Sequence, residues 1–184
     1  MFRQLFIISL AAVLTENFVL VQMLGVTPFL SGAKKIENAL KTGGAVTALM
    51  VCSSAATWAA QKFMLEPLEL EYMQTVCFVL VIAGLVQLAR KYVPLITTTV
   101  NCMVLGAAII NIERFGSAPL GFLKSLVNGT SAGVGFTLAA VLFAGLLSRV
   151  EKADIPKCLR GAPIALITAA LMSMAFMGFA GLSI

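Results

Sequence analysis

Residues 17–33 read NFVLVQMLGVTPFLSGA, an uncharged stretch that contains Gly25 and Pro28. Glu16 is the one charge within residues 4–33, and a continuous helix over that range would be about 45 Å long, whereas the hydrocarbon core of a bilayer is about 30 Å thick. Proline removes a backbone donor and clashes with the preceding turn, and glycine lowers helical rigidity. The stretch therefore predicts a first membrane span that is interrupted near Gly25 and Pro28.

The composition predicts that lipid surrounds this chain. Of its 184 residues, 60% are hydrophobic and 11% are charged, and the mean hydropathy is +1.00, whereas about 25% of residues are charged in a soluble domain. The net charge of +5 then assigns basic side chains to the cytoplasmic membrane face and excludes a nucleic-acid partner. Because the chain has no histidine, imidazole ligation and His-dependent nucleophilic catalysis are excluded.

The uncharged runs predict six helices that each cross the bilayer, in one integral membrane domain over residues 1–184. We interpret the apolar N-terminal segment as a retained first helix rather than a cleaved signal peptide, because apolar sequence continues beyond Ala12. A crossing helix needs about 20 apolar residues, which places the spans near residues 5–24, 40–60, 73–90, 93–112, 127–148 and 161–182.

The basic residues predict that both termini lie outside, because lysine and arginine in short loops stay on the cytoplasmic side. One side of the predicted topology carries nine of them: Lys34, Lys35, Lys41, Arg90, Lys91, Arg149, Lys152, Lys157 and Arg160. The opposite side carries Arg3, Lys62, Arg114 and Lys124.

A division near Arg90 leaves three spans in each half, residues 1–90 and 91–184, so a repeat between the halves must be inverted. When the first span is aligned with the fourth, only Val19/Val100, Leu24/Leu105 and Gly25/Gly106 coincide. The expectation of a repeat therefore depends on topology more than on sequence identity.

The fourth span begins PLITTTVNC, residues 94–102, with three threonines and an asparagine beside a proline. Polar groups and non-helical backbone at membrane depth are tolerated only where protein or a cavity surrounds them. We expect an all-α membrane protein of two inverted three-helix repeats, in which the first and fourth helices are interrupted and lie in the interior. The alternative is two kinked but continuous helices that pack through small residues.

Glu16 is a candidate for ion movement because of the cost of its burial. An ionised carboxylate within a span costs at least ~2.5 kcal/mol and is normally paired, protonated or facing water. Asn17 and Asn101 could form hydrogen bonds along the same ion pathway or to a cofactor. Alternatively, Glu16 lies near the interface with its side chain among headgroups, and the two amides only join helices.

The four cysteines at positions 52, 77, 102 and 158 form no C-x-x-C pair, so neither a zinc site nor a self-contained iron–sulfur site follows from their spacing. We expect Cys52 and Cys77 to be small buried side chains, and Cys158 to be a reduced thiol in a cytoplasmic loop. Cys102 differs, because it lies in the irregular part of the fourth span, from which a thiolate could reach a neighbouring subunit.

Several blocks in this order resemble the A-subunit family of the Rnf electron-transport complex, to which the D and E subunits of the sodium-translocating NADH:quinone reductase are related. The blocks are ENFVL (16–20), LGVTPFL (24–30), PLITT (94–98), NCMVLG (101–106) and ALITAALMSMAFMGF (165–179). The resemblance implies a six-helix inverted-repeat subunit of a bacterial or archaeal cytoplasmic membrane, which is not a catalyst on its own. It pairs with a homologous subunit of opposite topology, beside further subunits that carry flavin and iron–sulfur centres. Each member of the pair contributes two cysteines to a shared intramembrane [2Fe-2S] cluster, and electron transfer is coupled to Na⁺ or H⁺ movement.

The resemblance assigns one cluster ligand to Cys102, whereas the other family cysteine falls on Thr27. A threonine hydroxyl is a poorer iron ligand than a thiolate, because it stays protonated at neutral pH and is harder than sulfur. The cluster therefore either keeps three cysteines and an atypical fourth ligand, or is altered or absent; we expect it to be present in the assembled complex. The competing interpretations are a stand-alone secondary transporter and a scaffold subunit without a redox role.

Overall fold

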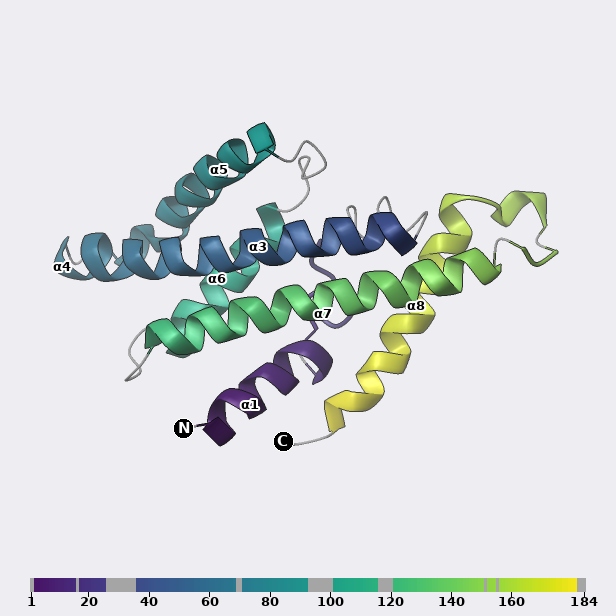
Figure 1. Ribbon diagram of the computed structural model, residues 1–184, viewed down its shortest axis with the longest axis horizontal. Helices are drawn as coiled ribbons and strands as arrows, with labels where there is room; N and C mark the ends of the chain where they lie inside the picture. Colours follow the sequence, from purple (N-terminus) through teal and green to yellow (C-terminus); the bar gives the residue numbers. More distant parts are fainter. Residues whose placement is uncertain are drawn as a thin grey trace.

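The computed structural model describes residues 2–15, 17–25, 36–68, 71–92, 101–115, 121–150, 152–154 and 156–181. Over these residues all regular structure is helical and no strand occurs, which confirms the all-α prediction. The longer helices are α1 (Phe2–Leu10), α3 (Ile36–Ala60), α5 (Gln74–Tyr92), α6 (Asn101–Phe115), α7 (Gly121–Val150) and α8 (Ala162–Met177) (Figure 1).

Short irregular helices extend several of these elements. Two are π-helical, Ala11–Thr15 after α1 and Gln61–Leu65 after α3, and α4 (Glu66–Leu68) follows the second. The 3₁₀ turns are Glu71–Met73 before α5, Lys157–Leu159 before α8 and Gly178–Gly181 after α8.

Each of the six predicted spans overlaps one of the longer helices, but only two helices in the described part of the chain meet the length and apolarity needed to cross a membrane. These two are Ile36–Leu65, which joins α3 to its π-helical extension, and α7, each with 30 residues. Apolar helices of 10–17 residues cover Phe6–Thr15, Gln74–Leu88 and Ala162–Met177. Six complete crossings therefore stay a prediction.

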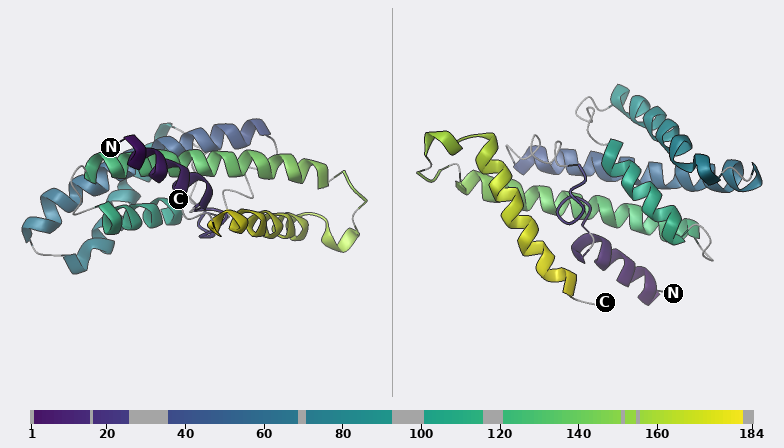
Figure 2. Two further views of the ribbon diagram at one scale, coloured as in Figure 1. Left: turned by 90° about the horizontal axis from the view of Figure 1, so that it is seen from below. Right: turned by 180° about the vertical axis from the view of Figure 1, so that it is seen from behind.

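Helices α3 and α7 lie side by side along most of their length and form the central pair of the molecule (Figures 1 and 2). They pack closely because glycines on each helix face hydroxyl residues on the other. A Cβ atom added at Gly43 would lie 2.6 Å from Thr137 Cγ2, and one added at Gly133 would lie 2.8 Å from Thr47 Cβ. In one contact α3 supplies the glycine and α7 the threonine, and in the other α7 supplies the glycine and α3 the threonine. On each helix the glycine lies four residues before the threonine.

Hydrogen bonds within each helix satisfy the two threonine hydroxyls at this contact. Thr47 Oγ1 donates to the carbonyl of Gly43 at 2.8 Å, and Thr137 Oγ1 donates to that of Gly133 at 2.9 Å. The two hydroxyl oxygens are 3.4 Å apart. Small residues that satisfy their own polar groups let helices approach closely without a hydrophobic driving force, as helices in lipid must.

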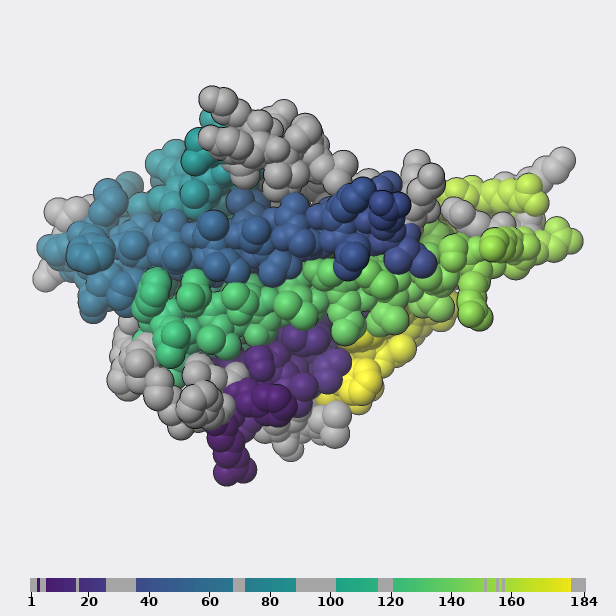
Figure 3. All heavy atoms as spheres, in the orientation of Figure 1, coloured from purple at the N-terminus to yellow at the C-terminus, as the bar shows by residue number. Residues whose placement is uncertain are grey.

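The interior is filled by large side chains around this pair, whereas much of the outer surface is also apolar. Phe78 from α5 and Phe136 and Phe143 from α7 are among the largest fully buried side chains. Figure 3 shows α3 and α7 along one face of the molecule. Large hydrophobic side chains also point outward, among them Leu80 and Leu88 on α5, Val134, Leu138, Leu142 and Leu146 on α7, and Leu166, Leu171 and Met174 on α8. An apolar surface on this scale is typical of contact with lipid or with a protein partner.

Candidate functional site

The predicted first span is interrupted at its centre. After α1 the chain forms the π-helical turn Ala11–Thr15, and residues 17–25 are a turn-rich segment outside any helix. The backbone is left-handed at Met23 (φ 56°) and Gly25 (φ 76°), a conformation that favours glycine. The helix therefore ends well before Gly25 and Pro28, where the break was predicted; Pro28 lies outside the described residues.

Asn17 organises this segment, which we call the central loop (residues 17–25). Its side chain is 1% exposed. Asn17 Nδ2 donates to the carbonyls of Val13 and Gly135, both at 3.1 Å. Asn17 Oδ1 accepts from the backbone N–H groups of Val19 at 3.1 Å and Leu20 at 3.3 Å. The amide thus satisfies backbone groups that the broken helix leaves behind and fixes the loop to α7.

Two further elements hold the central loop in the interior. The Ser173 hydroxyl of α8 donates to the carbonyl of Leu20. On the α6 side, a Cβ atom added at Gly106 would lie 2.6 Å from Leu24 Cδ1, and one added at Gly25 would lie 3.3 Å from Met103 Cβ. The loop from the first span therefore contacts the first turns of the helix in the fourth.

Cys102 lies at the edge of this contact. Helix α6 begins at Asn101, Cys102 is exposed, and the next residue, Met103, is 1% exposed against Gly25. The α6 start thus places a thiol on the surface directly beside the central loop. Residues 93–100 lie outside the described part of the chain, so the interruption of the fourth span stays a prediction.

The other predicted site residues are described only in part. Glu16 and Thr27 lie outside the described residues, and the Asn101 side chain is not described. Asn17 binds protein groups in this structure, and its place on an ion pathway stays a prediction. No group of three or more His, Cys, Asp or Glu side chains that could hold a metal occurs among the described residues.

The prediction that Cys52 and Cys77 are buried is wrong for Cys52, which is exposed, while Cys77 is half-buried. Helix α3 turns the neighbouring Ser53 and Ser54 inward instead, at 2% exposure each. Ser54 Oγ accepts a hydrogen bond from Asn111 on this inner face, and Cys52 lies on the outer face of the helix. Cys158 is exposed in the turn before α8.

A second buried polar group, which was not predicted from the sequence, is formed by Ser54 of α3, Asn111 of α6, and Ser125 and Asn128 of α7. Asn111 Nδ2 donates to Ser54 Oγ at 3.2 Å and to the Ser125 carbonyl at 3.5 Å, and Asn128 Nδ2 donates to Asn111 Oδ1. We call these four residues the amide cluster. Like Asn17, Asn111 and Asn128 are amides within uncharged runs, which need buried partners, and this signal could have identified them.

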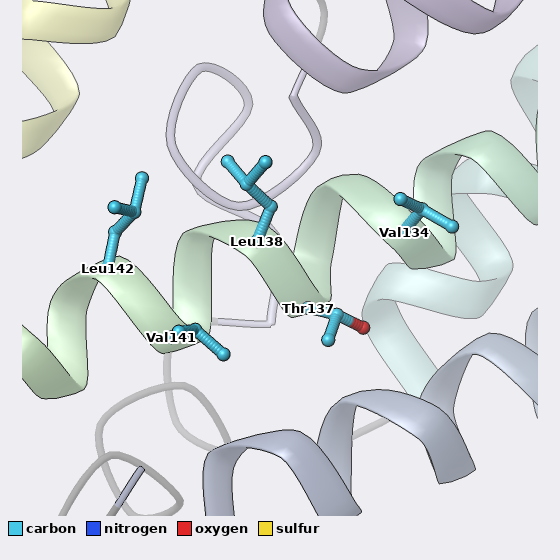
Figure 4. A pocket seen from close by; sticks show the side chains of 5 residues that line it. All are labelled: Val134, Thr137, Leu138, Val141 and Leu142. Carbon is cyan, nitrogen blue, oxygen red and sulfur yellow. The ribbon is translucent and has the colours of Figure 1, made fainter.

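A shallow hollow of about 420 Å³ on the outer face of α7 is lined by Val134, Thr137, Leu138, Val141 and Leu142 (Figure 4). Its lining is almost entirely apolar and includes no titratable group. It suits an acyl chain or an apolar partner surface better than a polar substrate.

The profile of a family described as "Rnf-Nqr subunit, membrane protein" matches the chain twice, over residues 5–91 and 90–183. This chain belongs to the Rnf-Nqr family of membrane subunits. The boundary between the two matches falls at Arg90 and Lys91, where the spans were predicted to divide into two halves.

Relatives of this Rnf-Nqr protein match over almost its entire length. The A subunit of the "Na(+)-translocating ferredoxin:NAD(+) oxidoreductase complex" of Acetobacterium woodii is 45% identical, with 98% of each chain covered. The A subunit of the "Ion-translocating oxidoreductase complex" of Syntrophotalea carbinolica is 48% identical with 98% of each covered, and that of Azotobacter vinelandii is 44% identical with 97% of each covered. The resemblance seen in the sequence blocks is thus confirmed.

Proposed function

We propose that this chain is the A-type membrane subunit of an ion-translocating electron-transport complex of the ferredoxin:NAD⁺ oxidoreductase type. The observation that carries the proposal is the identity of 44–48% with the A subunits of such complexes over almost the whole length of both chains. The protein acts inside the complex and is not a catalyst on its own.

The proposed architecture is a pair of inverted three-helix repeats in a bacterial or archaeal cytoplasmic membrane. The two successive family matches support a duplication. The exchanged contacts of Gly43 with Thr137 and Thr47 with Gly133 support an inversion, because a twofold axis between α3 and α7 would interchange them. The central loop and the start of α6 then occupy related positions near this axis.

The proposed redox centre is a [2Fe-2S] cluster that this chain shares with a homologous six-helix subunit of opposite topology. This chain supplies one of the two thiolates expected from its side of a shared cluster: Cys102 offers a surface thiol beside the central loop, and Thr27 supplies no second thiolate. When bound, such a cluster transfers single electrons. Cys102 would hold it, and the central loop would fix the position of the α6 start from which that thiol extends.

Replacement of Cys102 tests this role. In the purified complex we expect Cys102→Ala to abolish a [2Fe-2S]-type electron paramagnetic resonance signal and to lower the iron content, because alanine offers no metal ligand. Cys158→Ala, which removes an exposed thiol elsewhere, should leave both unchanged. An unaltered signal in Cys102→Ala would refute ligation by this residue.

Two other functions predict different behaviour on purification. A stand-alone transporter would purify without redox subunits and without iron. A scaffold subunit, an alternative that the threonine at position 27 leaves open, would purify with the complex but contribute no intramembrane signal even in the unmodified protein. The electron-relay role requires both co-purification and the signal.

Ion movement is proposed to pass Glu16, with Asn17 and Asn101 along the same route. Glu16→Gln keeps the size and one acceptor oxygen but removes the charge and the exchangeable carboxyl proton. We expect fewer ions to be moved per electron in proteoliposomes, while electron transfer continues. Glu37→Gln, an exposed position in the first turn of α3, is the control, and equal coupling ratios in the two variants would discard the role of Glu16.

A further inference from the structure

The amide cluster has features that helix packing alone does not explain. Its four members come from three helices, and all are buried, with exposures of 0% for Asn111, 1% for Ser125, 2% for Ser54 and 5% for Asn128. Two asparagines that bridge three helices can serve simply to join them. If the cluster only joined helices, however, each of its buried polar atoms should have a hydrogen-bond partner.

Two buried oxygens in this region do lack a partner among the described residues. These are Ser125 Oγ, within the cluster, and Gln61 Oε1, which lies two helical turns beyond Ser54 at the start of the π-helical extension of α3. Leaving a buried polar group unsatisfied costs about 1–3 kcal/mol. A bound water or ion is one way in which a native protein satisfies such a group.

The Ser125 hydroxyl also departs from the behaviour of other hydroxyls in these helices. Thr47, Ser53, Thr57, Thr137 and Thr168 each donate to a carbonyl three or four residues earlier in their own helix. Ser125 makes no such bond, and Ser54 Oγ accepts from Asn111 of another helix. Both hydroxyls of the cluster therefore remain available for partners outside their own helices.

The polar groups are confined to one side of the α3–α7 contact. At 1.5 Å per residue, Ser54 lies about 10 Å beyond Thr47 on α3, and Gln61, in the π-helical extension of α3, lies about 21 Å beyond it. Thr57, also buried, lies between them. In the opposite direction, α3 and α7 bury Ala39, Ala140, Ala144 and Leu147. These buried polar residues thus form a row that runs toward one end of the molecule, whereas these residues buried toward the other end are apolar.

The end that this row of polar residues approaches carries charges from the π-helical extension of α3, from α4 and from α6. Lys62 and Glu66 form an exposed ion pair with an N–O distance of 2.9 Å just beyond Gln61. Glu113 and Arg114, both exposed, follow Asn111 by less than one turn of α6. Exposed charges therefore lie at this end of the row, close in sequence to Gln61 and to Asn111.

We infer that residues Gln61, Ser54, Ser125, Asn111 and Asn128 line a hydrated inlet that binds water inside the helix bundle and opens at the end that carries Lys62 and Arg114. Alternating amide donors and hydroxyl or carbonyl acceptors can give each water the two to four bonds that a buried water needs. With no carboxylate among its members, the inlet imposes no fixed charge. The inlet provides aqueous access partway into the bundle and stops before the Thr47–Thr137 contact.

The inlet depends on the proposed function only for the membrane setting of α3 and α7, and its test does not depend on redox activity. In membrane vesicles that contain the assembled complex, Ser125→Cys should react with a small cationic methanethiosulfonate reagent, and peptide mass spectrometry separates this thiol from the native cysteines. Ala140→Cys, a buried position on the apolar side of the same helix, is the matched control. We expect a rate at least about tenfold higher at position 125, because thiol reactivity requires a solvated thiolate.

Equal, slow labelling at the two positions would overturn the inlet. If Ser125→Cys does not assemble, footprinting of the unmodified complex with hydroxyl radicals generated in bound water decides the question. Met50 and Met103 are both 1% exposed, but Met50 lies one turn from Ser54 and its carbonyl packs over Gly129, next to Asn128. Faster oxidation of Met50 than of Met103 supports the inlet, and equal oxidation contradicts it. Loss of iron or of ion coupling would instead concern the proposed function.

Discussion

Asn17 forms, in the protein interior, the kind of local turn that asparagine usually forms at a surface. Its Oδ1 accepts from the N–H groups two and three residues further on, which is the bonding of an Asx turn at a helix start. Its Nδ2 uses both hydrogens on carbonyls of the π-helical turn region and of α7. No aliphatic residue can supply these bonds in a dry environment.

Replacement of Asn17 by leucine should therefore destabilise the protein strongly. Backbone groups of Val19, Leu20 and Gly135 would be left buried without a partner, and each such group costs about 1–3 kcal/mol. We expect a clear fall in the melting temperature of the detergent-purified complex. Asn38→Leu, at an exposed position on α3, should change it little, and comparable melting temperatures for the two variants would contradict the structural role of Asn17.

At this scale the sequence predicted which residue is unusual but not what it binds. An amide within an apolar run is conspicuous, and Asn17 was selected on that basis. Its partner Gly135 is 118 residues away, and no local pattern indicates that pairing. Selection of every amide within an apolar run would also have included Asn111 and Asn128. The exposure of Cys52 could not be predicted in this way, because it depends on the rotation of α3 about its axis.

At the scale of elements, the packing of α3 against α7 depends on glycines at defined positions. The adjacent Gly43 and Gly44 differ completely in their surroundings. A Cβ atom at Gly43 would meet Thr137, whereas one at Gly44 would meet nothing within 4 Å. Alanine is more favourable than glycine within a helix by about 1 kcal/mol. Alanine substitutions at the two positions therefore separate this intrinsic preference from the effect of close packing, which only position 43 experiences.

We expect Gly43→Ala to lower the thermal stability of the complex and Gly44→Ala to leave it unchanged or raise it slightly. The added methyl group at position 43 overpacks the contact with Thr137, at a cost of about 1–3 kcal/mol. The double variant Gly43→Ala/Thr137→Gly should recover part of the loss if that contact is the cause. Equal melting temperatures for the two single alanine variants would show that α3 and α7 do not approach this closely.

The number of helices was predictable because charges are expensive in lipid, so uncharged runs mark the segments that lie within it. Their ends were less predictable. Helix α7 begins at Gly121, before Lys124, since a lysine can lie within a helix and extend its ammonium group toward water. In the first span the helix ended before Gly25, because the side chain of Asn17 stabilises the turn at an earlier position.

At the scale of the whole molecule, the basic residues predict how the bundle is oriented in the membrane. Their distribution predicts an outside C-terminus and a cytoplasmic connection between α7 and α8. That connection includes Lys152 and Asp154 in its described part. The prediction depends on chain topology alone and is independent of any cofactor.

Reporter fusions measure this orientation. Alkaline phosphatase fused after Ile184 should be active and green fluorescent protein at the same site dark, because phosphatase folds only outside the cytoplasm, where disulfides form. Fusions after Asp154 should give the reverse pattern. The same pattern at both sites would contradict a membrane crossing by α8, and a complete reversal would show that the C-terminus is cytoplasmic.

The exchanged glycine and threonine contacts have a consequence for the origin of the bundle. Each helix carries a glycine and, four residues later, a threonine on the face that meets the other helix. Such a surface is self-complementary, because it can pack against an antiparallel copy of itself. A half-length polypeptide with this surface, inserted in both directions, would have formed a homodimer through it. Fusion of two such copies would make the association permanent and leave each copy free to diverge in sequence.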